Sequence, residues 1–154
     1  MRVYLDNCCY NRPYDNQAQV RISLESQAKL HVQDLIREEK LELASSYTLT
    51  YENSRNPSEI KRRAIQQFLE DHTTVYVDES FSEQVSALAK EIMSTGVKTA
   101  DAYHAASAII AKCDYLLTTD DRLLKYKTDR IRIVDPIDFI QETGGEDHDE
   151  YEYC

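Results

Sequence analysis

Short segments rich in aliphatic and β-branched residues alternate along the chain with longer segments of helical periodicity. The short segments predict strands, at residues 2–5, 41–45, 74–78, 115–119 and 131–134. The intervening segments place apolar residues three or four positions apart, which is typical of amphipathic helices. Strands that alternate with helices indicate an α/β fold with a mainly parallel sheet.

The longest helical pattern covers residues 18–40, and a helix is favoured for residues 48–54. Pro57 fits the first turn of the next helix, because proline is well accommodated there. The apolar face of that helix is expected to contain Ile60, Ala64, Ile65 and Phe68.

Capping signals predict the bounds of two further helices. Ser80 and Glu83 have the spacing of a capping box, and Gly96 is expected to end the helix that they begin. Thr99 is expected to cap an alanine-rich helix at residues 100–112, which leads into the strand at residues 115–119.

The composition indicates one globular domain followed by a short acidic tail. The chain has 154 residues, of which 42% are hydrophobic and 30% charged, and it contains no apolar run of the roughly 18 residues that a membrane span requires. The amino-terminal segment lacks the apolar stretch of a signal peptide, so we expect a cytoplasmic protein. We expect a domain at residues 1–143 and a disordered tail at residues 144–154, which has no apolar periodicity.

Charge and cysteine content exclude two classes of function. The net charge is −10, and half of it comes from five acids of the tail, so nonspecific coating of DNA is disfavoured. The cysteines at positions 8, 9, 113 and 154 do not form a zinc-binding framework. Cys8 and Cys9 are expected to be small buried side chains at the end of the first strand.

Acidic residues lie next to several predicted strands. Asp6 and Asp120 each end a strand, and the carboxyl ends of parallel strands share one edge of the sheet, where function gathers. Asp101 begins the helix that leads into the strand of residues 115–119, and Glu52 lies shortly after the second strand. Converging carboxylates repel one another, and a hard divalent cation reverses this effect. We therefore expect Mg²⁺ or Mn²⁺ at this edge, where one or two ions suit phosphoryl chemistry.

Each acid also has a purely structural interpretation. Asp101 suits the first turn of a helix, where the helix dipole favours an anion. Asp120 suits a helix N-cap, and Glu52 suits an exposed helix surface. Because Asp120 is expected to end the strand directly, we assign it to the site and expect Asp121 to cap the helix or face water.

Three segments carry a resemblance to a known family: VYLDNCCYNRP, SYTLTYENSRNP and TADAYHAASAIIAKCDYLLTTDD. In this order they resemble the PIN-domain ribonucleases, including the VapC-type bacterial toxins, over residues 2–140. The resemblance implies a three-layer α/β/α sandwich with a central sheet of about five strands. It also implies an acidic cluster that binds Mg²⁺ or Mn²⁺ and hydrolyses single-stranded RNA. The matching catalytic and metal-binding acids are Asp6, Glu52, Asp101 and Asp120.

The resemblance also assigns supporting roles. Thr118 matches a small hydroxyl residue that hydrogen-bonds a carboxylate or a water molecule at the metal. Asn7 is either a supporting amide or a turn residue, and His104 lies on nearly the same helix face as Asp101 but is expected to be packed and hydrogen-bonded. The basic groups available for RNA are Arg12, Lys61, Arg62, Arg63, Lys125, Lys127, Arg130 and Arg132.

We therefore expect a metal-dependent endoribonuclease, the toxin of a toxin–antitoxin pair, with a small antitoxin protein as partner and a homodimeric state implied by the resemblance. The alternative is a module on the same fold that binds RNA or a partner protein without cleaving anything. Phosphatases with an Asp-x-Asp motif and response-regulator receivers fit less well, because the chain has Asp6-Asn7-Cys8 and no early acidic pair.

Overall fold

Five parallel strands form the central sheet of the computed structural model, which describes residues 1–144. The strands are β1 (Arg2–Leu5), β2 (Glu42–Ser46), β3 (Thr73–Val77), β4 (Tyr115–Leu117) and β5 (Arg132–Val134). Their order across the sheet is β3-β2-β1-β4-β5, and each neighbouring pair is parallel. The predicted α/β class and parallel sheet are confirmed, whereas the disordered tail was predicted for residues that lie almost wholly outside the described part of the chain.

Helices connect the strands and follow the last of them. The α-helices are α1 (Asn7–Asn11), α2 (Val20–Arg37), α3 (Tyr47–Ser54), α4 (Glu59–His72), α5 (Ser82–Met93), α6 (Thr99–Ile110), α7 (Asp121–Leu124) and α8 (Pro136–Thr143). Two short 3₁₀ helices, η1 (Arg12–Tyr14) and η2 (Glu79–Phe81), follow α1 and β3. Within residues 1–144 no helix is both long and apolar enough to cross a membrane.

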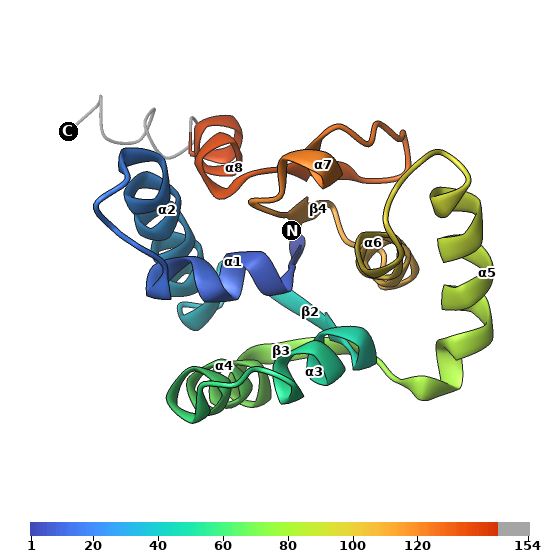
Figure 1. The fold of residues 1–154 in the computed structure, drawn as a ribbon, viewed down its shortest axis with the longest axis horizontal. Coiled ribbons are helices and arrows are strands. Elements are labelled where there is room, and N and C mark those ends of the chain that lie inside the picture. Colours follow the sequence, from blue (N-terminus) through green and yellow to red (C-terminus); the bar gives the residue numbers. More distant parts are fainter. Residues whose placement is uncertain (145–154) are drawn as a thin grey trace.

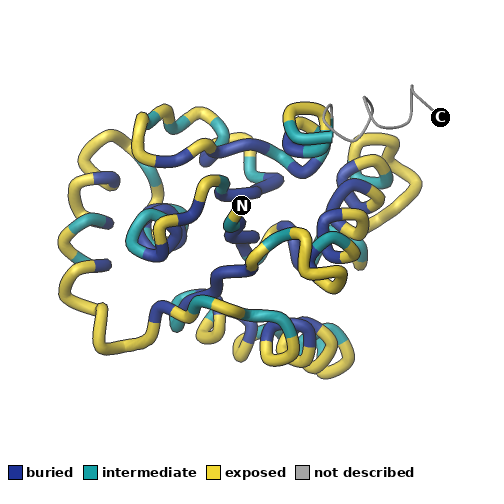
Figure 2. The backbone as a smooth tube through the Cα atoms, turned by 180° about the vertical axis from the view of Figure 1, so that it is seen from behind, coloured by how far each residue is buried: buried dark blue, intermediate teal, exposed yellow. Residues whose placement is uncertain are grey.

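The helices form a layer on each face of the sheet, as Figure 1 shows, with α2, α4 and α8 on one side and α5 and α6 on the other. Alternation along the strands explains this arrangement: Val3 and Leu5 pack toward the first layer, while Tyr4 between them packs toward the second. The strands β1, β2, β4 and β5 are largely buried, the edge strand β3 is partly exposed, and the outer helix surfaces are exposed (Figure 2). The expected α/β/α sandwich is therefore present.

The two layers carry connections that run in opposite directions. The chain moves from β1 to β2 to β3 through α2 and α4, then returns through α5 and α6 to β4, which pairs with β1. The strand order thus reverses between β1 and β4. In open parallel sheets this place forms a crevice at the carboxyl ends of the strands, where ligands bind.

Several predicted helix starts differ from the structure. Ser58 caps α4 by accepting a hydrogen bond from the Lys61 N–H, so Pro57 precedes the helix, and Ile60 is 80% exposed. The buried face of α4 contains Ile65, Phe68 and Leu69 instead, and Ala64 is exposed.

The two predicted caps further along the chain are also wrong. Asp78 caps η2 by accepting from the Ser80 N–H, so Ser80 lies inside η2 and the capping box does not form. Thr99 is the first residue of α6, and its N-cap position is Lys98. Gly96 adopts a φ of 103°, as expected for a glycine that ends a helix.

Candidate active site

The four predicted acids come from four different elements at the carboxyl end of the sheet. Asp6 follows β1 and is the N-cap of α1, and its backbone N–H donates to the Leu117 carbonyl at the end of β4. Asp120 is the N-cap of α7, and Asp101 lies in the first turn of α6. Glu52 lies on α3, which follows β2. The expectation that Asp120 ends its strand directly is wrong, because β4 ends at Leu117.

Asp6 is the most buried of these acids, with 2% of its surface exposed. Its Oδ1 accepts a hydrogen bond from the Cys9 N–H at 3.0 Å, and its Oδ2 accepts from the Thr118 hydroxyl at 2.5 Å. Burial raises the pKa of Asp6, while nearby His104 and these two hydrogen bonds oppose the increase. The side chain is thus held in one orientation at a cost in desolvation.

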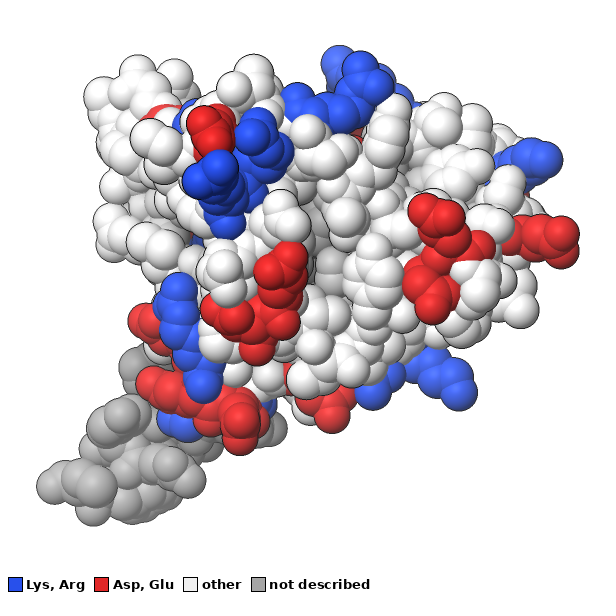
Figure 3. Space-filling model, turned by 90° about the horizontal axis from the view of Figure 1, so that it is seen from below, with Lys and Arg blue, Asp and Glu red and all other residues white. Residues whose placement is uncertain are grey.

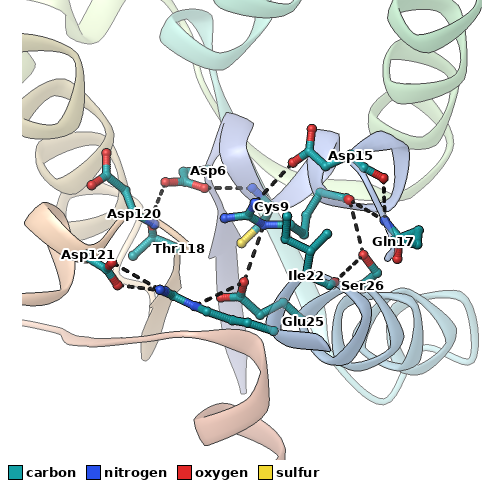
Figure 4. A network of polar contacts seen from close by, with 12 residues as sticks. Asp6, Cys9, Asp15, Gln17, Ile22, Glu25, Ser26, Thr118, Asp120 and Asp121 are labelled. Carbon is teal, nitrogen blue, oxygen red and sulfur yellow. Dashed lines mark hydrogen bonds and ion pairs between the residues drawn. The ribbon is translucent and has the colours of Figure 1, made fainter. Parts of the chain in front are cut away.

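Thr118 connects two of the acids. Its buried hydroxyl donates to Asp6 and accepts from the backbone N–H of Asp120 at 3.0 Å, so that the end of β1 is joined to the segment after β4. Figure 4 shows the carboxylates of Asp6 and Asp120 next to each other on either side of this threonine. One oxygen of Asp120 accepts from the Arg122 N–H at 2.8 Å, as helix capping requires.

The pKa of Asp101 responds to the charges of the other three acids. Its pKa is raised to about 6, first by burial, then by the negative charges of Asp120 and Asp6, and to a smaller extent by Glu52. Among the described residues no hydrogen bond or ion pair reaches the Asp101 carboxylate. The acids therefore lie close enough to repel one another, although they are far apart in the sequence.

Glu52 is held by a chain of buried polar groups. His104, which is 2% exposed, contacts the Glu52 carboxylate through Nε2 at 2.8 Å and the Tyr4 hydroxyl through Nδ1 at 2.7 Å. The Tyr4 hydroxyl also shares a hydrogen bond of 2.6 Å with Ser46, which caps α3. His104 is therefore packed and hydrogen-bonded as expected, and it fixes the orientation of a candidate site residue.

Cys8 lies within the field of all four acids. Its pKa is raised to about 12, first by partial burial of the thiol and then by the charges of Asp6, Asp120, Asp101 and Glu52. Cys9 is buried but Cys8 is exposed, so the expectation that both are buried is wrong. Sequence reasoning did not place Cys8 near the acids, because it did not predict α1, which contains Cys8 and begins at the Asp6 cap.

The other residues near the rim have structural partners. Asp121 is exposed to water, as one of the two alternatives expected, and it also accepts two hydrogen bonds from the Arg21 guanidinium, at 2.6 and 3.1 Å (Figure 4). It does not cap α7, whose N-cap is Asp120. Arg21 and Arg12 each lie 3.5 Å from the fully buried Glu25. The Asn7 side chain accepts from Asn11 at 3.1 Å, within α1.

The donor chemistry of the site suits a hard cation. The four acids offer carboxylate oxygens, and no Lys or Arg side chain of residues 1–144 forms an ion pair with any of them. The described residues do not, however, contain a group of three or more His, Cys, Asp or Glu side chains arranged to hold a metal ion. The structure thus brings the charges together without a preformed coordination sphere.

Comparison with known proteins agrees with this architecture. Two solved structures share the fold, each with a TM-score of 0.55: VapBC2 from Rickettsia felis bound to a DNA fragment from its promoter, and FitAcB from Neisseria gonorrhoeae. The first is 14% identical and covers 86% of this chain and 97% of its own, and the second is 18% identical and covers 87% and 97%. No curated protein gives a significant match. The sequence matches the PIN domain family model over residues 3–129, and the chain therefore belongs to the PIN domain family.

Proposed function

We propose that this protein is a metal-dependent endoribonuclease that hydrolyses phosphodiester bonds in single-stranded RNA. The observation that carries the proposal is the convergence of Asp6, Glu52, Asp101 and Asp120 at the switch point of the sheet, where the charges of the other three acids raise the pKa of Asp101. Uncompensated carboxylates at such a place cost stability, and a role in binding cations accounts for their presence. Membership of the PIN domain family, whose members are generally nucleases, supports the same conclusion.

The four acids are the residues that would hold Mg²⁺ or Mn²⁺. A bound divalent cation activates water and stabilises the negative charge that develops on the phosphate oxygens. The protein's own contribution is orientation: Thr118 and the Cys9 N–H fix Asp6, His104 fixes Glu52, and the Arg122 N–H fixes one oxygen of Asp120. Asp101 has no such partner among the described residues, so its carboxylate is the one most free to turn toward a cation.

We further propose that the protein is the toxin of a toxin–antitoxin pair. The sequence resembles VapC-type toxins, and the fold is that of VapBC2 and FitAcB. A small antitoxin protein that covers the rim is the partner expected from this role, and a homodimer is the expected assembly. This role places the protein in the cytoplasm, where its RNA substrates are found.

The test is a cleavage assay on a pool of cellular RNAs with Mg²⁺ or Mn²⁺, in which the cut ends are mapped. Asp6→Asn and Asp101→Asn are expected to lose cleavage, because each removes a negatively charged ligand. Asp121→Asn is the matched control, since it removes a charge from the same rim but from a residue paired with Arg21, and it is expected to cut. Equal cleavage by wild type, Asp6→Asn and Asp101→Asn would refute the mechanism.

The alternative, a module that binds RNA or protein without cleavage, makes a different prediction. Binding by such a module persists when a chelator removes divalent cations, and no RNA ends appear at any metal concentration. The repulsion among the acids favours the nuclease, because a binding module has no use for four carboxylates that disfavour a phosphate backbone unless cations lie between them.

A further inference from the structure

A pocket of about 520 Å³ opens beside Asp101, between the turn that joins α5 to α6 and the segment that follows α7. These two segments run side by side in Figure 1, although they are far apart in the sequence. Besides Asp101, the side chains of its wall that matter here are Lys98, Arg122, Lys125, Tyr126 and Lys127. We call this cavity the basic pocket, and it shares Asp101 with the candidate active site.

Within the described residues, the cations of the basic pocket have no acidic partner, whereas most other Lys and Arg side chains are in ion pairs. None of Lys98, Arg122, Lys125 and Lys127 forms an ion pair within residues 1–144. By contrast, Arg130 and Arg132, which follow closely in the chain, are paired with Glu91 and Glu142. The basic pocket therefore keeps its positive charge available to a ligand.

Several other basic groups that sequence reasoning offered for RNA binding are in ion pairs, whereas Lys61 lies over the Tyr14 ring and Arg62 donates to the Asn56 carbonyl. Arg12 is paired with Asp15 and with the buried Glu25, and Arg63 is paired with Glu59. On the face drawn in Figure 3, the acidic and basic side chains of the described residues lie in several small, separate groups. In a chain with a net charge of −10, a local cluster of four cations that form no ion pair within residues 1–144 is a feature that attracts an anion.

We propose that the basic pocket binds the sugar–phosphate backbone of the RNA strand next to the phosphodiester that is cut. This inference rests on the proposed nuclease function, because Asp101 forms the boundary between pocket and site. Lys98, at the N-cap of α6, and Lys125, at the C-cap of α7, face the pocket from opposite walls and contact successive phosphates. Tyr126 is partly buried against the core, and the part of its ring that lines the pocket offers a base an aromatic surface.

This geometry gives the substrate a direction of approach. The acidic rim repels the backbone in the absence of divalent cations, whereas the basic pocket attracts it with or without them, more weakly as the salt concentration rises. A strand therefore enters over α7, is held by the lysines, and presents the next phosphodiester to the acids. Binding and cleavage are in this way assigned to different groups of side chains that can be varied separately.

The experiment measures binding and cleavage of one fluorescein-labelled single-stranded RNA of mixed sequence. Lys125→Gln/Lys127→Gln keeps most of the length of both side chains and removes two charges, and the matched control Arg63→Gln/Lys112→Gln removes two charges from exposed positions outside the pocket. Binding is followed by fluorescence anisotropy in the Asp6→Asn background, which prevents cutting. Cleavage is followed in the wild-type background with Mn²⁺.

The pocket variant is expected to bind at least about tenfold more weakly than the control, and its plot of log affinity against log salt is expected to be shallower by about 1.4, the value for two phosphates of a single strand. Its KM should rise by a similar factor with kcat within about twofold. Affinity and KM equal to those of the control, in a protein whose wild type cuts RNA, would refute the pocket and leave the nuclease intact.

Two further outcomes separate the pocket from the proposed function. RNA binding that depends on Lys125 and Lys127 without any cleavage by wild type supports the pocket and refutes the nuclease. Preferential displacement of the RNA by an acidic peptide of equal charge refutes the assignment of a nucleic-acid backbone to this pocket. Thermal unfolding of each variant verifies that the exposed substitutions leave the fold unchanged.

Discussion

Replacing Asp101 by Asn should stabilise the protein in the absence of divalent cations. The pKa of Asp101 in the folded protein is about 6, against an ordinary value of 3.8, because the side chain is partly buried and lies near Asp120 and Asp6. The folded state therefore binds the Asp101 proton more tightly than the unfolded state does. It follows that this group destabilises the fold once it is ionised, and that an uncharged amide removes the penalty.

The magnitude follows from the size of the shift and from the exposure of the side chain. A shift of roughly two pKa units corresponds to about 3 kcal/mol, which is an upper limit. Asp101 is only half-buried, and water screens much of the repulsion, which lowers the figure to about 1–2 kcal/mol. An anion in the first turn of α6 also gains about 0.3–1 kcal/mol from the helix dipole, and asparagine loses this gain. We expect a net increase of about 1 kcal/mol in the free energy of unfolding.

The pH dependence of the stability difference tests the sign of the predicted effect. Above about pH 6 Asp101 is ionised in both states and the full gain of Asp101→Asn is present. As the pH falls through 6 toward 4, the folded wild type takes up its proton first, so wild type gains stability and the difference between the two proteins disappears. The wild type therefore approaches the variant in acid, because the penalty exists only where the carboxylate is charged.

Urea denaturation followed by far-ultraviolet circular dichroism measures this difference, since the chain has no tryptophan. Both proteins are unfolded in excess chelator at several pH values between about 4.5 and 8. Asp121→Asn is the control: it loses the ion pair with Arg21, which lowers the pKa of Asp121, and it should show no gain. If Asp101→Asn is no more stable than wild type at neutral pH, the acids do not repel one another and the site loses its main support.

Three further predictions concern the groups around the acids. Mn²⁺ at a hundred times its dissociation constant should raise the free energy of unfolding of wild type by about 2.7 kcal/mol. The same Mn²⁺ concentration should leave the thermal unfolding of Asp101→Asn nearly unchanged. A melting temperature of wild type that does not depend on the metal would exclude a cation site. Thr118→Val should destabilise the protein by about 1–3 kcal/mol and reduce cleavage, because it leaves a buried Asp6 oxygen without its donor, whereas Thr118→Ser should restore both properties. His104→Phe should lower kcat for RNA cleavage about tenfold or more with little change in KM, because His104 orients Glu52. If His104 acts only by positioning Glu52, the double variant Glu52→Gln/His104→Phe should have the same kcat as Glu52→Gln. An additive loss of kcat would show an independent role of His104.

The sequence predicted the sheet well, because its five strands are short segments rich in apolar and β-branched residues, and four of them are largely buried. It predicted helix starts poorly, since the caps depend on tertiary packing. Ser80 has ideal spacing for a capping box, but Asp78 begins a 3₁₀ turn before it and takes up its N–H. Ile60 fits an apolar face by spacing alone, yet that side of α4 is turned to solvent.

The candidate site was likewise predictable from the sequence only in part. Strand ends in a parallel sheet share one edge, and this topological rule was sufficient to group Asp6, Asp101 and Asp120. The partners of the acids were not predictable, because the Tyr4–His104–Glu52 and Thr118–Asp6 contacts join residues that are 52 to 112 positions apart. A hint existed only for His104, which follows Asp101 by three positions and therefore lies on nearly the same helix face.

The structural and the catalytic interpretations of these acids turn out to be compatible. Asp6 and Asp120 are both helix N-caps, but capping engages one carboxylate oxygen of each, and the Asp120 carboxylate has a second oxygen for which no donor is found within residues 1–144. Capping fixes the rotamer of the side chain, and the helix N-terminus stabilises the charged form that a cation requires. The same hydrogen bonds that begin α1 and α7 thus hold two carboxylates in fixed orientations at the rim. A helix cap that follows a parallel strand is for this reason a suitable position for a metal-binding acid.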